Sequence, residues 1–401
     1  MSETLTTNRQ FYVEGAESAA VGSVTTTYAA VNIGVPVIAV AIVVAVALFK
    51  RIDLVPIGVV ALPSLTLSAL QFISGRELSA ALLVPALIGA SVVALGIRID
   101  DLAVIGYLGG AVAVVSMIGM AVAPQSVLMS AGLAQAEKSL TGEPLLAGIF
   151  SHSNILGMFL GLSLPFAFLV KRWVISAILM VAICSALILT SSRTAVSGAL
   201  IVLAVALLGW ILPRAPWRII GVVGFVAVVS ALFVVPFSET DPAAYTYRGE
   251  IWMYNIDQWS QDRLFGLGAD WYRDNYRELR EILSSAASHA HNEALTLLVQ
   301  GGAVLLVAVG VLIASAWKGA AQQERRREGI TAVSFVLGFL LMSVTETTFP
   351  ILNWGPTSAV ALVPLFVLAA DAWGGRNVGS ASRARVAEGE DGFVTWRQWV
   401  N

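Results

Sequence analysis

The residues best suited to chemistry lie in a polar, aromatic stretch that runs from Pro236 to Asn292. The stretch holds five of the eight tyrosines, three tryptophans and many Asp, Glu and Arg residues, and it ends in His289-Ala290-His291-Asn292. Aromatic rings stack on the faces of sugars, while carboxylate and guanidinium groups bond hydroxyl and phosphate oxygens. This composition predicts a site that binds a sugar and a phosphate.

Two arginines in short motifs are candidates for binding the phosphate. Arg193 stands alone between two apolar runs, in the order Ser-Ser-Arg-Thr-Ala, and Arg248 begins an Arg-x-x-x-Trp motif inside the aromatic stretch. A guanidinium presents a planar fork of donors that matches phosphate. Each motif also has a simpler explanation. Arg193 would then be a snorkelling residue in a short hairpin, and Arg248 part of an amphipathic helix on the membrane surface.

Histidines mark two further motifs. His289 and His291 precede an apolar run, and a neutral histidine is the usual general base near pH 7. The alternative is a pair of ordinary polar residues at a helix start, with Asn292 or Ser288 as the cap. At the start of an earlier apolar run, the sequence favours a capping role for His152. The candidate substrate-binding residues are His289, Asn292, Ser192, Trp252, Tyr247 and Asn154.

The composition places these motifs in a membrane protein. The chain has 401 residues, of which 57% are hydrophobic and only 12% charged, with a mean hydropathy of +0.80. Soluble domains carry about 25% charged residues. The single cysteine, Cys184, excludes an intrachain disulfide and a cysteine-based metal site, and the three histidines are too unevenly placed to predict a metal cluster.

Apolar runs long enough for helical membrane spans, roughly 20 residues each, define the fold class. The sequence predicts an all-α polytopic membrane protein with about 11–12 transmembrane helices and one large outer loop, 236–292, that contains short helices. Residues 1–374 form a single transmembrane domain in this prediction, and 375–401 a polar cytoplasmic tail. The eleven runs lie near 29–49, 54–73, 78–97, 102–123, 154–170, 173–190, 195–212, 219–236, 293–316, 329–345 and 355–373.

Basic residues in the short loops predict the orientation, because cytoplasmic loops are rich in Lys and Arg. Alternate loops carry eleven Lys and Arg residues, whereas the other short loops carry only Arg76, Lys138 and Arg193. The basic loops and the C-terminus are therefore predicted inside. The aromatic stretch, the long 124–153 loop, the three histidines and Arg193 are predicted on the outer face.

In their order and spacing, these motifs resemble the O-antigen ligase and O-antigen polymerase superfamily over most of the chain. The resemblance rests on Phe150 and Asn154 at the start of a span, the Ser-Arg-Thr-Ala hairpin, and the outer loop from Arg-x-x-x-Trp to Gly-x-Gly. It continues with His-Asn-x-x-Leu before a glycine-bearing span. This chain departs from the family pattern in having Gly301-Gly302 followed by Ala303, where the family often has Gly-x-x-Gly.

The resemblance implies a glycosyltransferase of the outer face of the bacterial cytoplasmic membrane. Its donor would be an undecaprenyl-diphosphate-linked glycan, its acceptor a glycan or glycolipid, and its surroundings membrane lipid, with no nucleic acid. His291, in the His-Asn pair, would be the general base, and Arg193 and Arg248 would bind the diphosphate. Because arginines can meet the charge of the leaving diphosphate, and the outer loops lack Asp-x-Asp, we expect no metal and no cofactor.

Two other function classes compete with the enzyme. A transporter of lipid-linked polysaccharide would be expected to place ionisable residues within its spans, whereas these span interiors are almost free of Asp, Glu, Lys and Arg. A structural or sensor protein would account for the aromatic residues of the loop but not for the set of two arginines and a histidine. The sequence does not distinguish a ligase from a polymerase.

Overall fold

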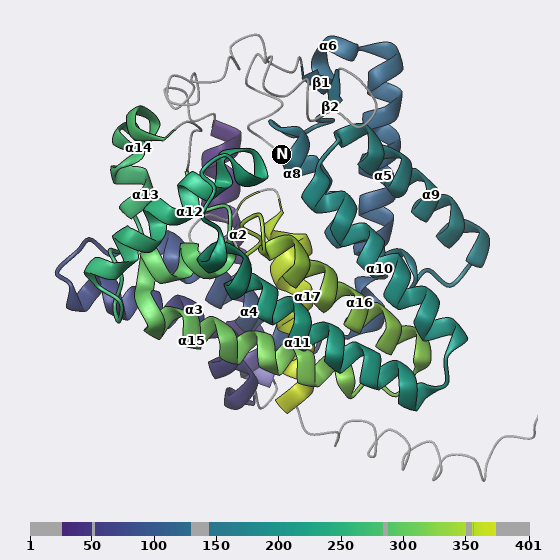
Figure 1. Cartoon of the computed structure of the whole chain (residues 1–401). Coiled ribbons are helices and arrows are strands. Elements are labelled where there is room, and N and C mark those ends of the chain that lie inside the picture. The colour runs from purple at the N-terminus through teal and green to yellow at the C-terminus, as the bar shows by residue number, and fades with distance from the viewer. Residues whose placement is uncertain are drawn as a thin grey trace, which may run out of the picture.

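The computed structural model describes residues 26–49, 53–129, 144–283, 288–349, 355 and 357–373. The prediction of an all-α fold is confirmed, and each of the eleven predicted spans coincides with a helix (Figure 1). These helices are α2 (Thr26–Phe49), α3 (Leu54–Ile73), α4 (Val84–Leu95), α5 (Ala103–Val122), α8 (Ser153–Ala167), α9 (Trp173–Thr190), α10 (Arg193–Ile211), α11 (Arg214–Ser238), α15 (Glu293–Ala321), α16 (Arg326–Ser343) and α17 (Ser358–Trp373).

Six helices of the described part are long and apolar enough to cross a membrane. They are α3, α9, α10, α11, α15 and the combined helix Ile99–Val122, which joins η4 (Ile99–Leu102) to α5. Shorter apolar helices are formed by Gly34–Leu48 of α2, by the whole of α8 and α17, and by Ala80–Leu95, which contains η3 (Ala80–Leu83) and α4. The protein is therefore a multi-pass membrane protein, and the crossing of the remaining helices stays a prediction.

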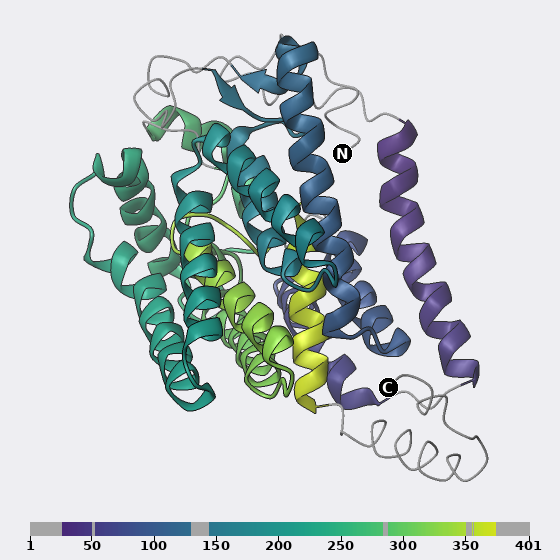
Figure 2. The same ribbon diagram turned by 90° about the vertical axis from the view of Figure 1, so that its right-hand side faces the viewer.

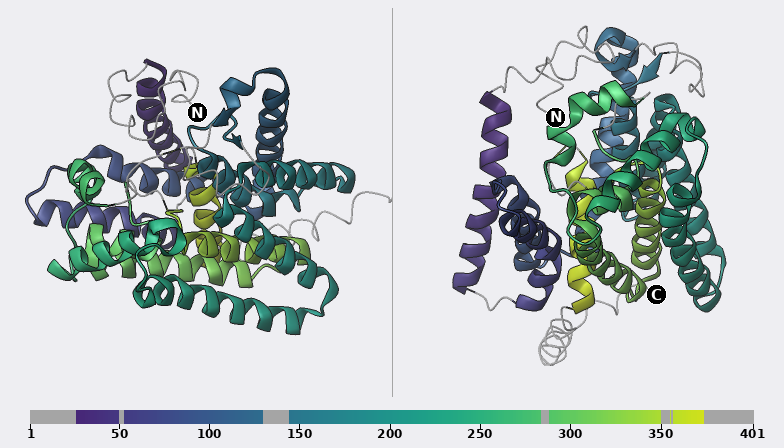
Figure 3. Two further views of the ribbon diagram at one scale, coloured as in Figure 1. Left: turned by 45° about the horizontal axis from the view of Figure 1, so that its top comes forward. Right: turned by 60° about the vertical axis from the view of Figure 1, so that its left-hand side comes forward.

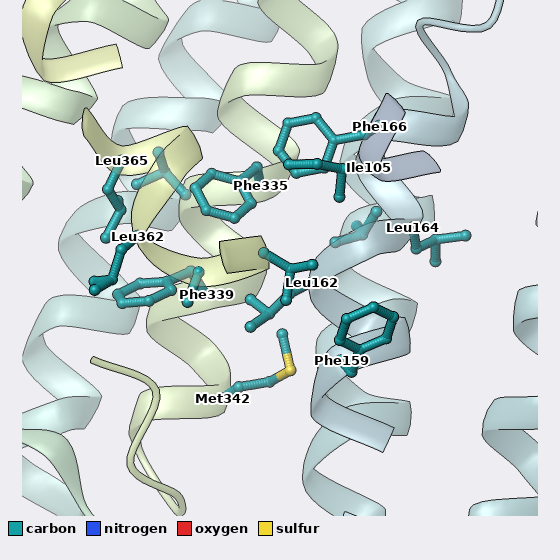
Figure 4. Packing of buried hydrophobic residues seen from close by; sticks show 14 of the residues in the cluster. Ile105, Phe159, Leu162, Leu164, Phe166, Phe335, Phe339, Met342, Leu362 and Leu365 are labelled. Atoms are coloured by element: carbon teal, nitrogen blue, oxygen red, sulfur yellow. The ribbon is translucent and has the colours of Figure 1, made fainter. Parts of the chain in front are cut away.

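The centre of the bundle is built from α8, α16 and α17. Figure 4 shows Phe159, Leu162 and Phe166 of α8 facing Phe335, Phe339 and Met342 of α16, with Leu362 and Leu365 of α17 beside them. The rings of Phe166 and Phe335 lie 5.2 Å apart between centroids. Helix α2 lies at the edge of the bundle in Figures 2 and 3, on the side of α4. The central packing fixes the ends of α8 and α16, which carry residues of the site.

The predicted outer loop contains short helices, as expected. They are α12 (Ala244–Gln261), α13 (Trp271–Asp274) and α14 (Tyr276–Ile282), which lie together at the upper left of Figure 1. Elsewhere the described part includes α6 (Pro124–Val127) and a two-stranded antiparallel ribbon of β1 (Leu128–Met129) and β2 (Leu145–Leu146). The predicted tail, 375–401, lies outside the described residues.

Helix α15 is broken at Gly302, whose φ of 61° and ψ of −161° belong to a region that only glycine enters readily. Backbone groups of the predicted outer loop replace the helical hydrogen bonds that are lost at the break. Leu267 N–H donates to Val299 O at 2.6 Å, and Ala303 N–H donates to Arg263 O at 2.9 Å. The Gly-x-Gly motif of the loop and the Gly301-Gly302 pair thus form one joint, since lost helical bonds inside a span must be replaced by neighbouring groups.

Candidate active site

Glu346 lies where all four sequence motifs meet. It follows α16, is only 3% exposed, and forms an ion pair with Arg248 Nη2 through Oε1. Its other oxygen, Oε2, lies 3.1 Å from Nδ1 of His291. Asn154 Nδ2, from the start of α8, donates to Glu346 Oε1 at 3.4 Å. The Ser-Arg-Thr-Ala motif joins through Thr194, whose Oγ1 accepts from Arg248 Nη1 at 3.5 Å.

Arg248 reaches this cluster from the first regular turn of α12. The three residues before it have left-handed backbone, with φ between 51° and 65°. A side chain on Gly249 would lie 2.0 Å from the carbonyl oxygen of Asp241, so glycine is needed for the close approach of these segments. Three successive non-glycine residues in this region are strained, and such strain concentrates at functional sites.

His291 is held at a fixed angle just before α15. Its φ is 47°, its backbone N–H donates to Nδ1 of His289 at 3.1 Å, and the two rings lie 4.2 Å apart between centroids. An ionised carboxylate only accepts hydrogen bonds, so Glu346 selects the neutral tautomer with the proton on Nδ1 of His291. This assignment leaves the lone pair on Nε2 for a proton transfer.

Asn292 and Glu293 hold the segment that carries Glu346. Asn292 caps α15, since its Oδ1 accepts from Leu295 N–H at 2.9 Å, and its Nδ2 donates to the carbonyl oxygen of Val344 at 2.9 Å. Oε2 of Glu293 accepts the backbone N–H groups of Thr348 and Phe349 at 2.7 and 2.8 Å. The two residues after His291 therefore clamp the chain on both sides of Glu346.

The amino end of α10 forms the second part of the site. Arg193 is the first residue of this helix and is exposed, while Ser192 before it and Thr194 after it are buried. Unpaired N–H groups and the helix dipole favour an anion at such an end. A Cβ on Gly157 of α8 would lie 2.7 Å from Cβ of Ser192, so this glycine lets the turn approach α8.

The charge state of the cluster follows from its contacts. Burial by itself raises the pKa of Glu346, but the adjacent His291 and Arg248 outweigh it and leave the pKa below its usual range, so the carboxyl is ionised. Burial, with a smaller effect of His291, lowers the pKa of His289 to about 3. His289 is therefore neutral at physiological pH.

His289, His291 and Glu346 also form a group that could hold a metal ion, since their ligand atoms lie within 4.8 Å of one another. Arg248 argues against this use, because its guanidinium already occupies the carboxylate and places a positive charge beside the group. The arrangement suits proton transfer better than metal binding, and metal independence stays a prediction.

The other predicted residues take different positions. Trp252 is completely buried in a small core with Ile251, Tyr272 and Leu279, so its place is structural. Tyr247 is 47% exposed and available to a ligand. Asn292 acts as the cap, as the simpler explanation expects. His152 likewise caps α8, since its Nδ1 accepts from Asn154 N–H at 3.0 Å.

Sequence reasoning missed Glu346, Thr194 and Glu293. The signal for Glu346 is weak: one acidic residue between two threonines, at the end of an apolar run in a chain with few charges. Its partners His291 and Arg248 lie 55 and 98 residues away along the chain, so no local pattern links them.

Comparison with known protein families gives a match over about a third of the chain. Residues 175–310, from α9 through the outer loop into α15, match the family model of the O-antigen ligase. No curated protein matches the chain. The family match supports a glycosyltransferase-like role in surface polysaccharide biosynthesis, with lipid-linked glycan and acceptor as general substrates. The match and the motifs together support a place for this chain in the O-antigen ligase superfamily, with the similarity covering residues 175–310 of its 401 residues.

Proposed function

We propose that this protein transfers a glycan from undecaprenyl diphosphate to a glycan or glycolipid acceptor on the outer face of the bacterial cytoplasmic membrane. The observation that carries the proposal is the convergence of Arg248, His291 and the Arg193 turn around one buried carboxylate. This set joins a proton acceptor to phosphate-binding groups, which is the combination that glycan transfer from a lipid diphosphate needs.

Arg193 and Arg248 hold the diphosphate in this proposal. A guanidinium has five N–H donors, and Arg248 uses its Nη atoms on Glu346 and Thr194 while keeping further donors for a ligand. Arg193 adds its charge at the amino end of α10. As the bond from the anomeric carbon to the diphosphate breaks, the electron pair stays on the diphosphate, and these cations stabilise the negative charge that develops.

His291 removes the proton from the acceptor hydroxyl. The hydroxyl oxygen attacks the anomeric carbon from the side opposite the diphosphate, and its proton passes to Nε2 of His291. Glu346, hydrogen-bonded to Nδ1, keeps the ring in position and stabilises the imidazolium that forms. Glu346 is a positioning residue in this scheme, and no step requires a metal or a cofactor.

The decisive experiment offers the purified protein a polyprenyl-diphosphate-linked glycan and an acceptor, with and without EDTA. The proposal expects a new glycosidic bond and free polyprenyl diphosphate in both conditions. If the lipid-linked glycan crosses a vesicle membrane without any bond being made or broken, the protein is a transporter. Loss of transfer in EDTA, with recovery on adding a divalent cation, would contradict metal independence.

A comparison of acceptors separates the two branches of the superfamily. A lipid A core acceptor tests the ligase reaction, and a second lipid-linked repeat unit tests the polymerase reaction. Both reactions need the same donor chemistry, so the choice between them belongs to residues that contact the acceptor. Exposed aromatic residues of the outer loop, such as Tyr245 and Tyr247, are the candidates for this contact.

A further inference from the structure

A cavity lies at the end of the bundle opposite the candidate active site. It has a volume of about 220 Å³ and is lined by residues of the α10–α11 turn, the end of α15 and the start of α16. The α10–α11 turn lies at the lower right of Figure 1. Helix α16 joins the two places, since Arg326 begins it and Glu346 follows its end. Its 18 residues rise about 27 Å at 1.5 Å each, close to the roughly 30 Å of a bilayer core.

Arginines line the polar side of this cavity. Arg326 is committed to the protein, since it donates to the carbonyl oxygens of Gly209 and Leu212 at 2.8 and 2.9 Å. Arg325 is paired with Asp100 and Glu328 at 3.0 Å each. The contacts of these two arginines hold α16 against its neighbours, so we do not assign them to ligand binding.

Arg214 and Arg218 make fewer contacts with the protein and keep donors for a ligand. They stand four residues apart on one face of α11, and both are exposed. Arg214 donates to the carbonyl oxygen of Glu324 at 2.9 Å, and Arg218 has no hydrogen bond or ion pair with the described residues. Like charges at this spacing repel each other, and Glu324, which also lines the cavity, supplies one negative charge against these two positive ones.

The other side of the cavity is apolar and aromatic. Trp217 and Trp317 line it, and Trp317 stacks on Phe225 with 4.4 Å between ring centroids. Gly221 contributes no side chain here. Val222, also on the wall, is 50% exposed on α11, which is long and apolar enough to cross a membrane. The cavity thus combines a cationic rim at the membrane surface with an apolar wall and tryptophans, which favour the membrane interface.

We propose that this cavity binds a phosphate-bearing head group, and that the occupant is an anionic phospholipid of the leaflet opposite the active site. Basic pockets between membrane helices suit such head groups. The volume is below the roughly 300–1,000 Å³ of pockets for drug-sized ligands, which fits a head group whose acyl chains lie outside along α11. The preference of cytoplasmic loops for Lys and Arg would by itself explain the basic residues at this end of the bundle. It does not require a cavity or the two tryptophans that line it.

The test measures lipid binding to the full-length protein in detergent by native mass spectrometry. Phosphatidylglycerol, phosphatidylcholine and inorganic phosphate are titrated separately. The Arg214→Gln/Arg218→Gln variant is compared with Lys171→Gln/Arg172→Gln, which removes two charges from a loop outside the cavity. We expect binding of phosphatidylglycerol to weaken at least about tenfold in the first variant, as for loss of one charge-assisted contact, and to stay unchanged in the second.

A second variant, Gly221→Leu, fills the cavity while keeping both arginines, and it should also abolish tight binding of phosphatidylglycerol. If the protein binds inorganic phosphate but binds phosphatidylglycerol no more tightly than phosphatidylcholine, the cavity is an anion site whose occupant is free phosphate and not a phospholipid. Equal affinity for the two lipids without phosphate binding, or equal losses in the two charge variants, would overturn the proposal.

Discussion

The buried carboxylate of Glu346 contacts both His291 and Arg248. The sequence predicts a histidine base and an arginine pair for phosphate, but it does not show that one carboxylate bonds both His291 and Arg248. This link has a chemical consequence, because the carboxylate sets the tautomer of the imidazole and the position of the guanidinium together. The base and the diphosphate site are therefore expected to respond jointly to changes at Glu346.

Replacing Glu346 with glutamine tests this link. Glutamine keeps the shape but removes the charge and allows the wrong tautomer of His291, so we expect kcat to fall at least about tenfold while the variant remains folded. The matched control is Glu328→Gln, which removes a carboxylate at the opposite end of α16. Steady-state kinetics and donor binding of both variants provide the measurement. Equal, small effects would mean that Glu346 only supports the fold.

The burial of His289 is expected to make the stability of the folded protein decrease at acidic pH. Burial lowers its pKa to about 3 in the folded protein, whereas the unfolded chain binds the proton near the ordinary value of about 6.5. The unfolded state therefore gains protons first as the pH falls, and stability decreases below about pH 6.5. The midpoint of thermal unfolding between pH 7 and 5 should fall more steeply in the wild type than in His289→Asn. Parallel slopes would contradict this assignment.

At the scale of elements, the broken helix α15 is the feature that the sequence hides. The hydropathy of residues 293–316 predicts one continuous span, and the structure instead places a joint at Gly302 that is closed by backbone groups of the outer loop. Local periodicity cannot reveal this break, because the replacement hydrogen-bond partners come from Arg263 to Gly268, more than 30 residues earlier. The Gly301-Gly302 pair is visible in the sequence only as a departure from the family pattern.

Gly302→Ala should destabilise the protein by about 1–3 kcal/mol, since its φ and ψ are almost exclusive to glycine. A Cβ there would also lie 2.2 Å from the carbonyl oxygen of Leu264. Gly310→Ala is the control, because the same helix leaves open space around that residue. Thermal unfolding in detergent compares the two. A Gly302→Ala variant as stable as Gly310→Ala would mean that the joint is not required.

For the whole molecule, the sequence predicts the helices better than the contacts between them. All eleven apolar runs coincide with helices. The hydropathy of each run alone indicates a span, and the backbone hydrogen bonds of a helical span lie within the segment itself. The site required long-range contacts. Arg248 and His291, predicted for different roles, contact the same carboxylate, whereas Trp252, predicted to bind substrate, is completely buried in a local core.

The orientation of the bundle remains a prediction from the basic loops. In a variant without Cys184, single cysteines at Glu281 on α14 and at Gln322 after α15 should react with a membrane-impermeant reagent from opposite sides. Glu281 should react from outside intact cells, because the outer loop is predicted there. Labelling of both positions from one side would remove the orientation and the outer-face mechanism.

Comparing His291→Ala with His289→Ala in single-turnover glycan transfer, with donor binding measured separately, tests the central claim most directly. The two histidines are two residues apart and in ring contact, so both variants disturb the same region. We predict that His291→Ala binds the lipid-diphosphate donor but transfers its glycan about 10²–10⁴-fold more slowly, whereas His289→Ala is less affected. Near-normal transfer by His291→Ala would contradict the assignment of His291 as the base.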